Sequence, residues 1–349
     1  MLRRILAAIA LAVAALALLF FVGPVYRIEP PAEPPALPAE AADGAALERW
    51  IAAREAAHPD IVPGAEKALV WAHADRRRTP LSIIYLHGYS ATRQEIAPFC
   101  DLLAARLGAN LFYTRLSGHG RAPAAMGEVT GGDWLQDAAE ALAIGQRIGE
   151  RVLVVGTSTG GTLALWLAQQ PEASSIAAQL LLSPNLGPKD PNADLLAGPW
   201  GAQLQQWLIG EEHRWQPANP EQAKFWSWRY PARALVPMMA LVQEVRASPL
   251  EQIRVPTLVV YSPLDQVVSP QRIEEAFGRL TMPVRRLHHA APGEDRSQHV
   301  LAGDILAPSG TAPLLAEMLA FIETLPGTPA SAATRVQAPL GTQGVSVAR

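Results

Sequence analysis

The sequence predicts an α/β domain, with a mostly parallel sheet flanked by helices and an inserted helical cap, preceded by an N-terminal transmembrane helix. Short β-branched or aliphatic runs alternate with stretches of helical periodicity from about residue 65 to residue 325, which is typical of a parallel sheet with crossover helices. One segment, about residues 185–247, breaks this alternation and predicts the cap. The residues from Ile5 to Tyr26 carry no charge and predict the membrane helix.

The N-terminal run is long enough to cross a bilayer. Arg3 and Arg4 precede it, and about 20 apolar residues at ~1.5 Å each span the ~30 Å hydrocarbon core. We interpret residues 1–26 as an uncleaved anchor, because the apolar run continues past the small residues that a cleaved signal, the alternative, would need at its end. The basic N-terminus predicts a single-pass protein whose folded domain is extracytoplasmic, and periplasmic if the source is a Gram-negative bacterium.

Two further segments lie outside the predicted domain. Residues 27–46 are rich in proline and alanine and predict an extended spacer. Residues 326–349 lack apolar periodicity and predict a disordered tail. The remaining residues, 47–325, are therefore expected to form one domain together with its cap.

The elements of that domain follow from the positions of the apolar runs. The expected strands are residues 69–72, 81–86, 110–113, 151–155, 179–182, 257–261 and 284–287. The expected helices are residues 94–107, 131–149, 160–169, 270–280 and 313–324. Five of the nine tryptophans lie between Trp200 and Trp228, which predicts either an apolar roof over a pocket or a small core of the cap itself.

Composition excludes several function classes. The 29 basic and 32 acidic residues give a net charge of -3, which argues against a nucleic-acid partner. The single cysteine, Cys100, excludes an intramolecular disulfide. The histidines show no metal-ligand spacing and no phosphate-binding loop occurs, so we expect neither a metal nor a cofactor.

A glycine-rich motif places a serine on a tight turn. Gly156-Thr157-Ser158-Thr159-Gly160-Gly161 follows the strand expected at residues 151–155 and opens a helix. A serine on a strained strand-to-helix turn needs small neighbours, so that the helix can approach the strand closely. Ser158 is therefore the predicted nucleophile.

Such a serine needs a base, and the base needs an orienting acid. Asp265 follows the strand expected at residues 257–261, and His299 lies in a later loop, so the order is serine, acid, histidine. Competing candidates are His288 and His289 for the base, and Glu294 and Asp295 for the acid. We prefer Asp265 and His299, because an acid four residues before the histidine would leave Asp265 without a role.

The developing oxyanion needs two preorganised donors. The backbone amide of Thr159, directly after the serine, is one candidate. The other is expected in the loop after residues 81–86, where His87-Gly88-Tyr89 follows, and we assign it to the amide of Tyr89.

Together these motifs resemble the α/β-hydrolase superfamily, and most closely its branch of monoacylglycerol lipases, serine aminopeptidases and carboxylesterase-like enzymes. The resemblance covers about residues 65–325 and rests on the following segments: His87-Gly88, Leu116-Ser117-Gly118-His119-Gly120, Gly156 to Gly161, Pro263-Leu264-Asp265-Gln266-Val267-Val268, and His299-Val300-Leu301. It implies Ser158 as nucleophile, Asp265 and His299 as acid and base, and the Tyr89 and Thr159 amides as oxyanion hole. Threonine at position 159 departs from the Met or Gln of many such esterases, and His119 is expected to be structural.

The sequence thus predicts a serine hydrolase that cleaves carboxylic esters, lipid-derived acylglycerols included, through an acyl-enzyme on Ser158. A peptide- or amide-cleaving enzyme and a noncatalytic, membrane-tethered binder of apolar ligands are the alternatives. The expected partners are a small-molecule ester and the membrane; the oligomeric state is left open.

Overall fold

The computed structural model describes residues 1–29, 31, 37–39 and 43–325. Within these residues, seven strands form one sheet in the order β1-β3-β2-β4-β5-β8-β9, and all neighbours are parallel except β1 and β3. The strands of this sheet are β1 (Ala68–Val70), β2 (Thr79–Leu86), β3 (Asn110–Tyr113), β4 (Gly149–Thr157), β5 (Ile176–Leu182), β8 (Thr257–Tyr261) and β9 (Arg285–His289). The predicted fold class is confirmed.

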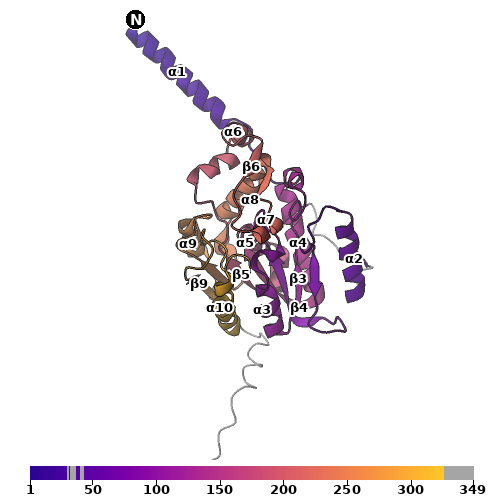
Figure 1. Cartoon of the computed structure of the whole chain (residues 1–349). Coiled ribbons are helices and arrows are strands. Elements are labelled where there is room, and N and C mark those ends of the chain that lie inside the picture. Colours follow the sequence, from indigo (N-terminus) through magenta and orange to yellow (C-terminus); the bar gives the residue numbers. More distant parts are fainter. Residues whose placement is uncertain (30, 32–36, 40–42, 326–349) are drawn as a thin grey trace, which may run out of the picture.

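Helices cover both faces of the sheet (Figure 1). Those of the domain body are α2 (Gly44–Ala56), α3 (Phe99–Leu107), α4 (Gly131–Ile148), α5 (Thr159–Leu167), α9 (Pro270–Arg279) and α10 (Thr311–Glu323). One apolar core packs α2, α4, α5 and α9 against one face, with Trp134 at its centre, and a second packs α3 and α10 against the other, around Phe99 and Phe321. Strands β2, β4 and β5 are buried between the two cores, which explains their unbroken apolar runs.

One expected helix is wrong in detail. Residues 94–107 were expected as a single helix, but the structure has a 3₁₀ turn, η2 (Arg93–Ile96), and then α3 from Phe99. Pro98 separates the two, because proline has no N–H to donate and disfavours helical backbone at the residue before it. Glu95 on η2 accepts the hydroxyl of Tyr85 on β2 and the N–H of Gly88, so η2 lies at the carboxyl end of β2.

The cap contains a hairpin that the sequence pattern did not reveal. Its helices are α6 (Gly201–Leu208), α7 (Pro220–Phe225) and α8 (Leu235–Ala247), and its strands are β6 (Glu212–Arg214) and β7 (Arg229–Pro231), which pair antiparallel. Strands of three residues are too short to leave a readable alternation. The remaining short 3₁₀ turns are η3 (Pro123–Glu128), η4 (Pro171–Ser175), η5 (Pro191–Ala197), η6 (Ala232–Ala234), η7 (Leu250–Gln252) and η8 (Pro308–Gly310).

The cap tryptophans are divided between core and surface. Trp226 is buried among core residues, whereas the side chain of Trp207 is 78% exposed. The expected roof or cap core therefore accounts for only part of the cluster. Trp207 belongs to α6, the cap helix that lies at the end of the N-terminal helix (Figure 1).

The N-terminal helix α1 (Leu2–Phe21) is long and apolar enough to cross a membrane. It projects away from the domain (Figure 1). Residues 30, 32–36 and 40–42 of the expected spacer, and the expected tail at 326–349, lie outside the described residues. Helix α2 begins at Gly44, inside the segment expected as spacer, and the side chain of Asp43 caps it by accepting the N–H of Ala46 at 2.6 Å.

Candidate active site

Ser158 lies on the turn between β4 and α5, with φ 53° and ψ -119°. This left-handed backbone is strained for a residue with a Cβ, and the close packing of its neighbours maintains it. A Cβ on Gly156 would lie 2.5 Å from the carbonyl oxygen of Gly160, and a Cβ on Gly160 would lie 1.9 Å from that of Leu86. The two glycines of the motif are therefore required by the contact between the turn, the helix and the adjacent strand.

Strand β5 and the loop after it hold the turn from the other side. The N–H of Ser158 donates to the carbonyl of Leu182 at 2.9 Å, and the N–H of Asn185 donates to the carbonyl of Ser158 at 2.9 Å. Ser183, which directly follows Leu182, donates its hydroxyl to the carbonyl of His299 at 2.8 Å. The serine turn and the histidine loop are thus joined through the end of β5.

The structure brings Asp265 and His299 together. The distance from Nδ1 of His299 to Oδ2 of Asp265 is 2.8 Å, and both side chains are buried. The other oxygen of Asp265, Oδ1, accepts the backbone N–H groups of Val267 at 2.7 Å and Val268 at 2.9 Å. Since the carboxylate can only accept, Nδ1 of His299 carries the proton, and Nε2 has the lone pair that a general base needs.

The surroundings raise the pKa of His299 above its usual value. Burial alone lowers this pKa, but the negative charge of Asp265 and its hydrogen bond raise it, and the charges of Glu95 and Asp295 add to the increase. The charge on the imidazolium that forms when Nε2 takes a proton is therefore stabilised by carboxylates.

The competing candidates lie elsewhere. His288 faces Glu317, with Nδ1 3.6 Å from Oε2, and Nε2 of His289 lies 2.9 Å from the hydroxyl of Tyr261. Oδ2 of Asp295 accepts the backbone N–H groups of His299 and Val300, each at 2.9 Å. Asp295 therefore holds the backbone of the histidine loop and does not contact the ring through a hydrogen bond. Glu294 accepts the N–H of Ser309 at 3.3 Å.

The predicted oxyanion loop lies against the serine. A Cβ on Gly88 would lie 3.2 Å from the Cβ of Ser158, so the His87-Gly88-Tyr89 segment passes directly over it. In the described part of the chain, none of the hydrogen bonds takes the backbone N–H of Tyr89 or of Thr159. Both amides are therefore available as donors, while their role in stabilising an oxyanion stays a prediction.

Two buried histidines support this loop. Nε2 of His87 accepts the N–H of Leu116 at 3.0 Å, and Nδ1 of His87 contacts the carbonyl of Gly88 at 2.9 Å, which joins the oxyanion loop to residues 116–120. His119 contacts the carbonyl of Ser117 through Nδ1 at 3.0 Å. Burial lowers the pKa of His119 to about 4, and it lowers the pKa of His87 well below the usual value of a histidine. Both are neutral in the folded protein at pH 7.

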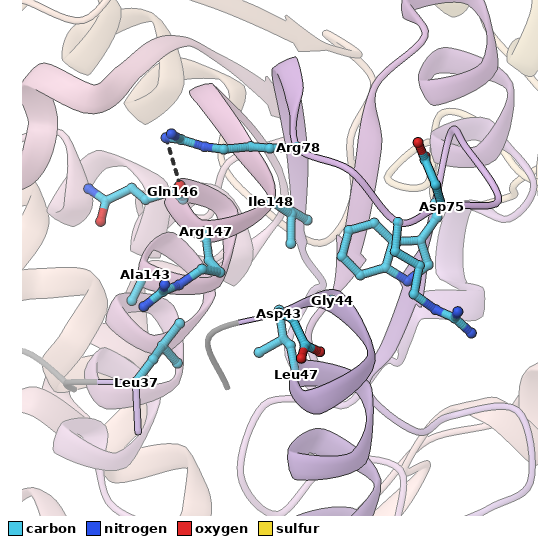
Figure 2. Close-up of a pocket in the computed structure, with 12 residues that line it drawn as sticks. Leu37, Asp43, Gly44, Leu47, Asp75, Arg78, Ala143, Gln146, Arg147 and Ile148 are labelled. Carbon is cyan, nitrogen blue, oxygen red and sulfur yellow. Dashed lines mark hydrogen bonds between the residues drawn. The ribbon is translucent and has the colours of Figure 1, made fainter. Parts of the chain in front are cut away.

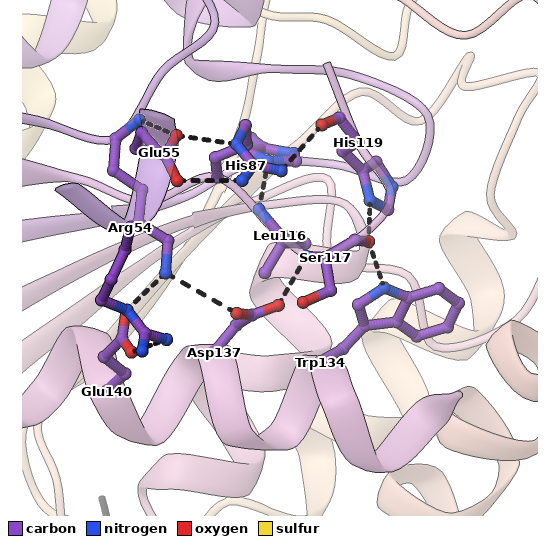
Figure 3. A network of polar contacts seen from close by, with 11 residues as sticks. Arg54, Glu55, His87, Leu116, Ser117, His119, Trp134, Asp137 and Glu140 are labelled. Atoms are coloured by element: carbon purple, nitrogen blue, oxygen red, sulfur yellow. Dashed lines mark hydrogen bonds and ion pairs between the residues drawn. The ribbon is translucent and has the colours of Figure 1, made fainter. Parts of the chain in front are cut away.

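A buried polar network anchors residues 115–120 to α2 and α4 (Figure 3). Arg115 and Glu55 form two hydrogen bonds of 2.8 and 2.9 Å, and Trp134 donates its indole N–H to the carbonyl of Ser117 at 3.0 Å. The ammonium group of Lys67, itself buried, forms an ion pair with Glu140. These pairs satisfy charges that would be costly to bury alone, and they fix the loop behind the oxyanion segment.

Glu95 is a carboxyl at the site that the sequence patterns did not indicate. Its Oε2 accepts the N–H of Gly88 at 2.8 Å and the hydroxyl of Tyr85 at 2.9 Å, and its Oε1 lies 2.6 Å from the place that a Cβ on Gly88 would take. Burial raises the pKa of Glu95. Glu95 lies on η2, outside the motifs that predict the site, so no sequence motif identifies it.

The molecule also has a cleft away from these residues. It has a volume of about 730 Å³, and its lining includes Arg78, Arg147 and Asp43, where the end of α4 meets the start of β2 and α2 (Figure 2). In a parallel sheet this is the edge opposite the one where Ser158 lies. None of the predicted catalytic residues lines it.

Comparison with known proteins agrees with this geometry. The family described as "Serine aminopeptidase, S33" matches residues 78–294, which include Ser158 and Asp265. A protein named thermostable monoacylglycerol lipase from Bacillus sp. (strain H-257) is 26% identical over 201 residues, 57% of this chain and 76% of that protein.

Solved structures of similar shape include a soluble variant of monoglyceride lipase from Saccharomyces cerevisiae. Its TM-score is 0.59 at 12% identity, over 76% of this chain and 98% of that one. A metagenome-derived lipolytic enzyme gives a TM-score of 0.58 at 22% identity, over 75% of this chain and 99% of the other. These likenesses show the fold. Because the family match spans more than half of the chain, this protein belongs to the serine aminopeptidase S33 family of the α/β-hydrolase superfamily.

Proposed function

We propose that this protein is a membrane-anchored serine hydrolase that cleaves carboxylic esters, lipid-derived acylglycerols among them, through an acyl-enzyme on Ser158. The observation that carries the proposal is the buried hydrogen bond between His299 and Asp265, in a loop that the end of β5 joins to the strained turn of Ser158. Relatives named as monoacylglycerol lipases support the choice of ester substrates.

In the proposed reaction, Oγ of Ser158 attacks the ester carbonyl while Nε2 of His299 takes the hydroxyl proton. The N–H groups of Tyr89 and Thr159 stabilise the oxyanion that forms, and removing one such donor typically costs roughly 3 to 4 kcal/mol of transition-state stabilisation. His299 then gives its proton to the departing alcohol, leaving the acyl group on Ser158. Water, deprotonated by His299, attacks this acyl-enzyme and releases the carboxylic acid, which restores the serine.

A fluorophosphonate probe tests the nucleophile. We expect the probe to label the intact protein and the Ser158→Ala variant to remain unlabelled. Ser174→Ala is the matched control, because Ser174 is exposed on η4, which precedes β5 at the opposite edge of the sheet. Labelling that persists in Ser158→Ala would contradict the assignment.

Peptide or amide cleavage is the second candidate, because the matching family is described as a serine aminopeptidase. A p-nitrophenyl ester and a p-nitroanilide of the same acyl group separate the two activities. We expect the ester to be the better substrate by kcat/KM; a preference for the anilide would favour the amidase. Absence of turnover for both compounds at every acyl-chain length, with apolar ligands still bound, would favour a noncatalytic binder.

The membrane anchor and its orientation belong to the same proposal. Helix α1 supports the anchor by its length and composition, and Arg3 and Arg4 support a cytoplasmic N-terminus. We expect a C-terminal alkaline phosphatase fusion to be active and a C-terminal fluorescent-protein fusion to be dark, as for an extracytoplasmic domain. The reverse result would contradict the orientation, and an N-terminal mass that lacks residues 1–26 would identify a cleaved signal.

A further inference from the structure

Helix α6 of the cap begins where the N-terminal helix ends. The N–H of Trp200, the residue before α6, donates to the carbonyl of Pro24 at 2.8 Å, and its indole N–H donates to the carbonyl of Phe20 at 3.0 Å. A Cβ on Gly23 would lie only 2.0 Å from the indole nitrogen, so the ring of Trp200 packs directly on the backbone there. The last turn of α1 and the start of the cap are thus joined by specific contacts (Figure 1).

The cap presents apolar side chains to solvent at this end. The exposed fractions are 78% for Trp207, 69% for Leu208, 37% for Ile209 and 44% for Leu195, which lies on η5 before α6. We call these four residues the cap patch. Large apolar side chains that gather on a surface mark a site of interaction with a protein or a membrane.

Charge and position both favour a membrane as the occupant. Residues 195–210 contain no Asp, Glu, Lys, Arg or His, so no ionised side chain of this segment would have to enter a lipid interface. If α1 spans the bilayer, Phe20 lies near its surface, and Trp207 lies about 10 Å along α6 from Trp200. Tryptophan is also the side chain most typical of the membrane–water interface, because one end of its ring system is polar and the rest apolar.

The cap patch belongs to the structure that covers the predicted nucleophile. Helix α8 of the cap packs on α5, which begins directly after Ser158, and Asn185 contacts both Thr159 Oγ1, at 3.3 Å, and the sulfur of Met238 on α8, at 3.6 Å. A cap seated on the bilayer therefore places the covered site next to the lipid surface.

We infer that the cap patch inserts into the interface of the bilayer that holds α1, so that the enzyme takes its substrate from the membrane surface. The inference rests on the membrane anchor proposed above and names the phospholipid interface as the occupant. A second protein molecule is the competing occupant, and the measurements below distinguish the two.

Depth measurement on the full chain tests the insertion. In a Cys100→Ala background, single cysteines replace Trp207 in the cap patch, Leu11 in the middle of α1 and the exposed Ser174 at the far edge of the sheet, and each carries an NBD fluorophore. The proteins are reconstituted into phosphatidylcholine–phosphatidylglycerol vesicles that contain lipids with a doxyl quencher at carbon 5 or carbon 12.

We expect the label at position 207 to be quenched, and more strongly by the 5-doxyl than by the 12-doxyl lipid. The label at position 11 should show the opposite order, and the label at position 174 should not be quenched. If position 207 behaves like position 174 while position 11 is quenched, the anchor stands and the inference is overturned. If position 11 also escapes quenching, the anchor fails, and the inference with it. Shielding of position 207 that depends on protein density and not on the doxyl lipids would identify a second copy as the occupant and overturn the inference.

Kinetics give a second test. A Trp207→Ser, Leu208→Ser double variant should hydrolyse monoolein presented in vesicles about tenfold more slowly than the unchanged protein, because it loses apolar contact with the lipid. Its kcat/KM for p-nitrophenyl butyrate in water should not change. Val70→Ser, a substitution of an exposed apolar residue on the edge strand β1, is the matched control and should leave both rates unchanged. Equal losses on the two substrates, or no loss on vesicles, would contradict the inference.

Discussion

Replacing Asp265 by asparagine should abolish most of the activity without disturbing the fold. In the protein, Oδ1 of Asp265 accepts two backbone N–H groups, those of Val267 and Val268, while Oδ2 accepts Nδ1–H of His299. In Asp265→Asn the amide oxygen should keep the two backbone donors. Its NH₂ group then faces His299, so Nδ1 must accept and the proton moves to Nε2.

The size of the expected loss of kcat follows from the cost of the alternative orientation of the amide in Asp265→Asn, in which its oxygen and NH₂ group are exchanged. Turning it round would put the NH₂ group against the N–H donors of Val267, which is part-buried, and Val268, which is buried, and each unsatisfied buried donor costs about 1 to 3 kcal/mol. The orientation that reverses the tautomer of His299 is therefore preferred by at least about 1 to 3 kcal/mol, the cost of the one buried donor. A histidine whose Nε2 already carries a proton cannot take one from Ser158, and the same replacement in a serine protease lowers kcat by about 10⁴-fold. We expect a loss of about 10²- to 10⁴-fold here.

The assay is kcat for a short p-nitrophenyl ester at pH 8 in detergent, with the active fraction counted by fluorophosphonate titration. Asp295→Asn is the matched control: its oxygens hold the backbone N–H groups of His299 and Val300, so we expect a fall of less than about tenfold, from loop displacement. If instead Asp295→Asn loses activity by orders of magnitude and Asp265→Asn loses less than tenfold, the assignment of the orienting acid is wrong.

Three further predictions concern the pH response and the packing of the site. The base must be neutral to take a proton, and the pKa of His299 is raised, so the acid limb of the pH profile of kcat/KM should lie above pH 6.5. Glu95→Gln removes one negative charge near His299 and should move that limb to lower pH. A limb that does not move would show that Glu95 does not act on His299. Gly160→Ala should destabilise the protein by at least about 3 kcal/mol, because the new Cβ would lie 1.9 Å from a backbone oxygen, whereas Gly278→Ala on α9, with nothing within 4 Å, should not lower the melting temperature. The pKa of His119 is lowered to about 4 in the folded protein, so as the pH falls the unfolded chain protonates this histidine first. The contribution of His119 to the free energy of unfolding should be complete above pH 6.5 and fall by up to about 3 kcal/mol as the pH drops towards 4. A His119→Leu variant that loses stability equally steeply would contradict the assignment of this loss to His119.

The sequence predicts those features whose cause is local. The strand, turn and helix around Ser158 lie within about twenty consecutive residues, and the glycines that permit the turn are visible in the motif itself. The inner strands β2, β4 and β5 are also recognisable, because a strand buried on both faces is largely apolar.

Features that depend on distant contacts are less accessible. Asp265 and Asp295 both follow strands near the catalytic edge, and the sequence favours Asp265 only by the indirect argument that Asp295 as the acid would leave Asp265 without a role. The structure shows that Asp265, 34 residues before His299, meets its ring, while the nearer Asp295 meets its backbone. The difference is a matter of side-chain direction in two loops, which the packing of those loops decides.

Glu95 and the cap patch illustrate the same limit. In the sequence, Glu95 is one acidic residue in a polar segment, and Trp207 is one of nine tryptophans. Folding buries Glu95 against Gly88 and leaves Trp207 exposed on α6, the helix that follows the contact between Trp200 and the end of α1.

The sequence by itself therefore determined the fold class, the nucleophile turn and the apolar N-terminal run, because each is encoded by residues close together in the chain. The tertiary structure places Asp265, the preferred acid, at the ring of His299, and it decided which further carboxyl lies against Gly88 and which cap residues face outward. Those outcomes depend on contacts between segments far apart in sequence, where chemically equivalent side chains compete and only the packed geometry distinguishes them.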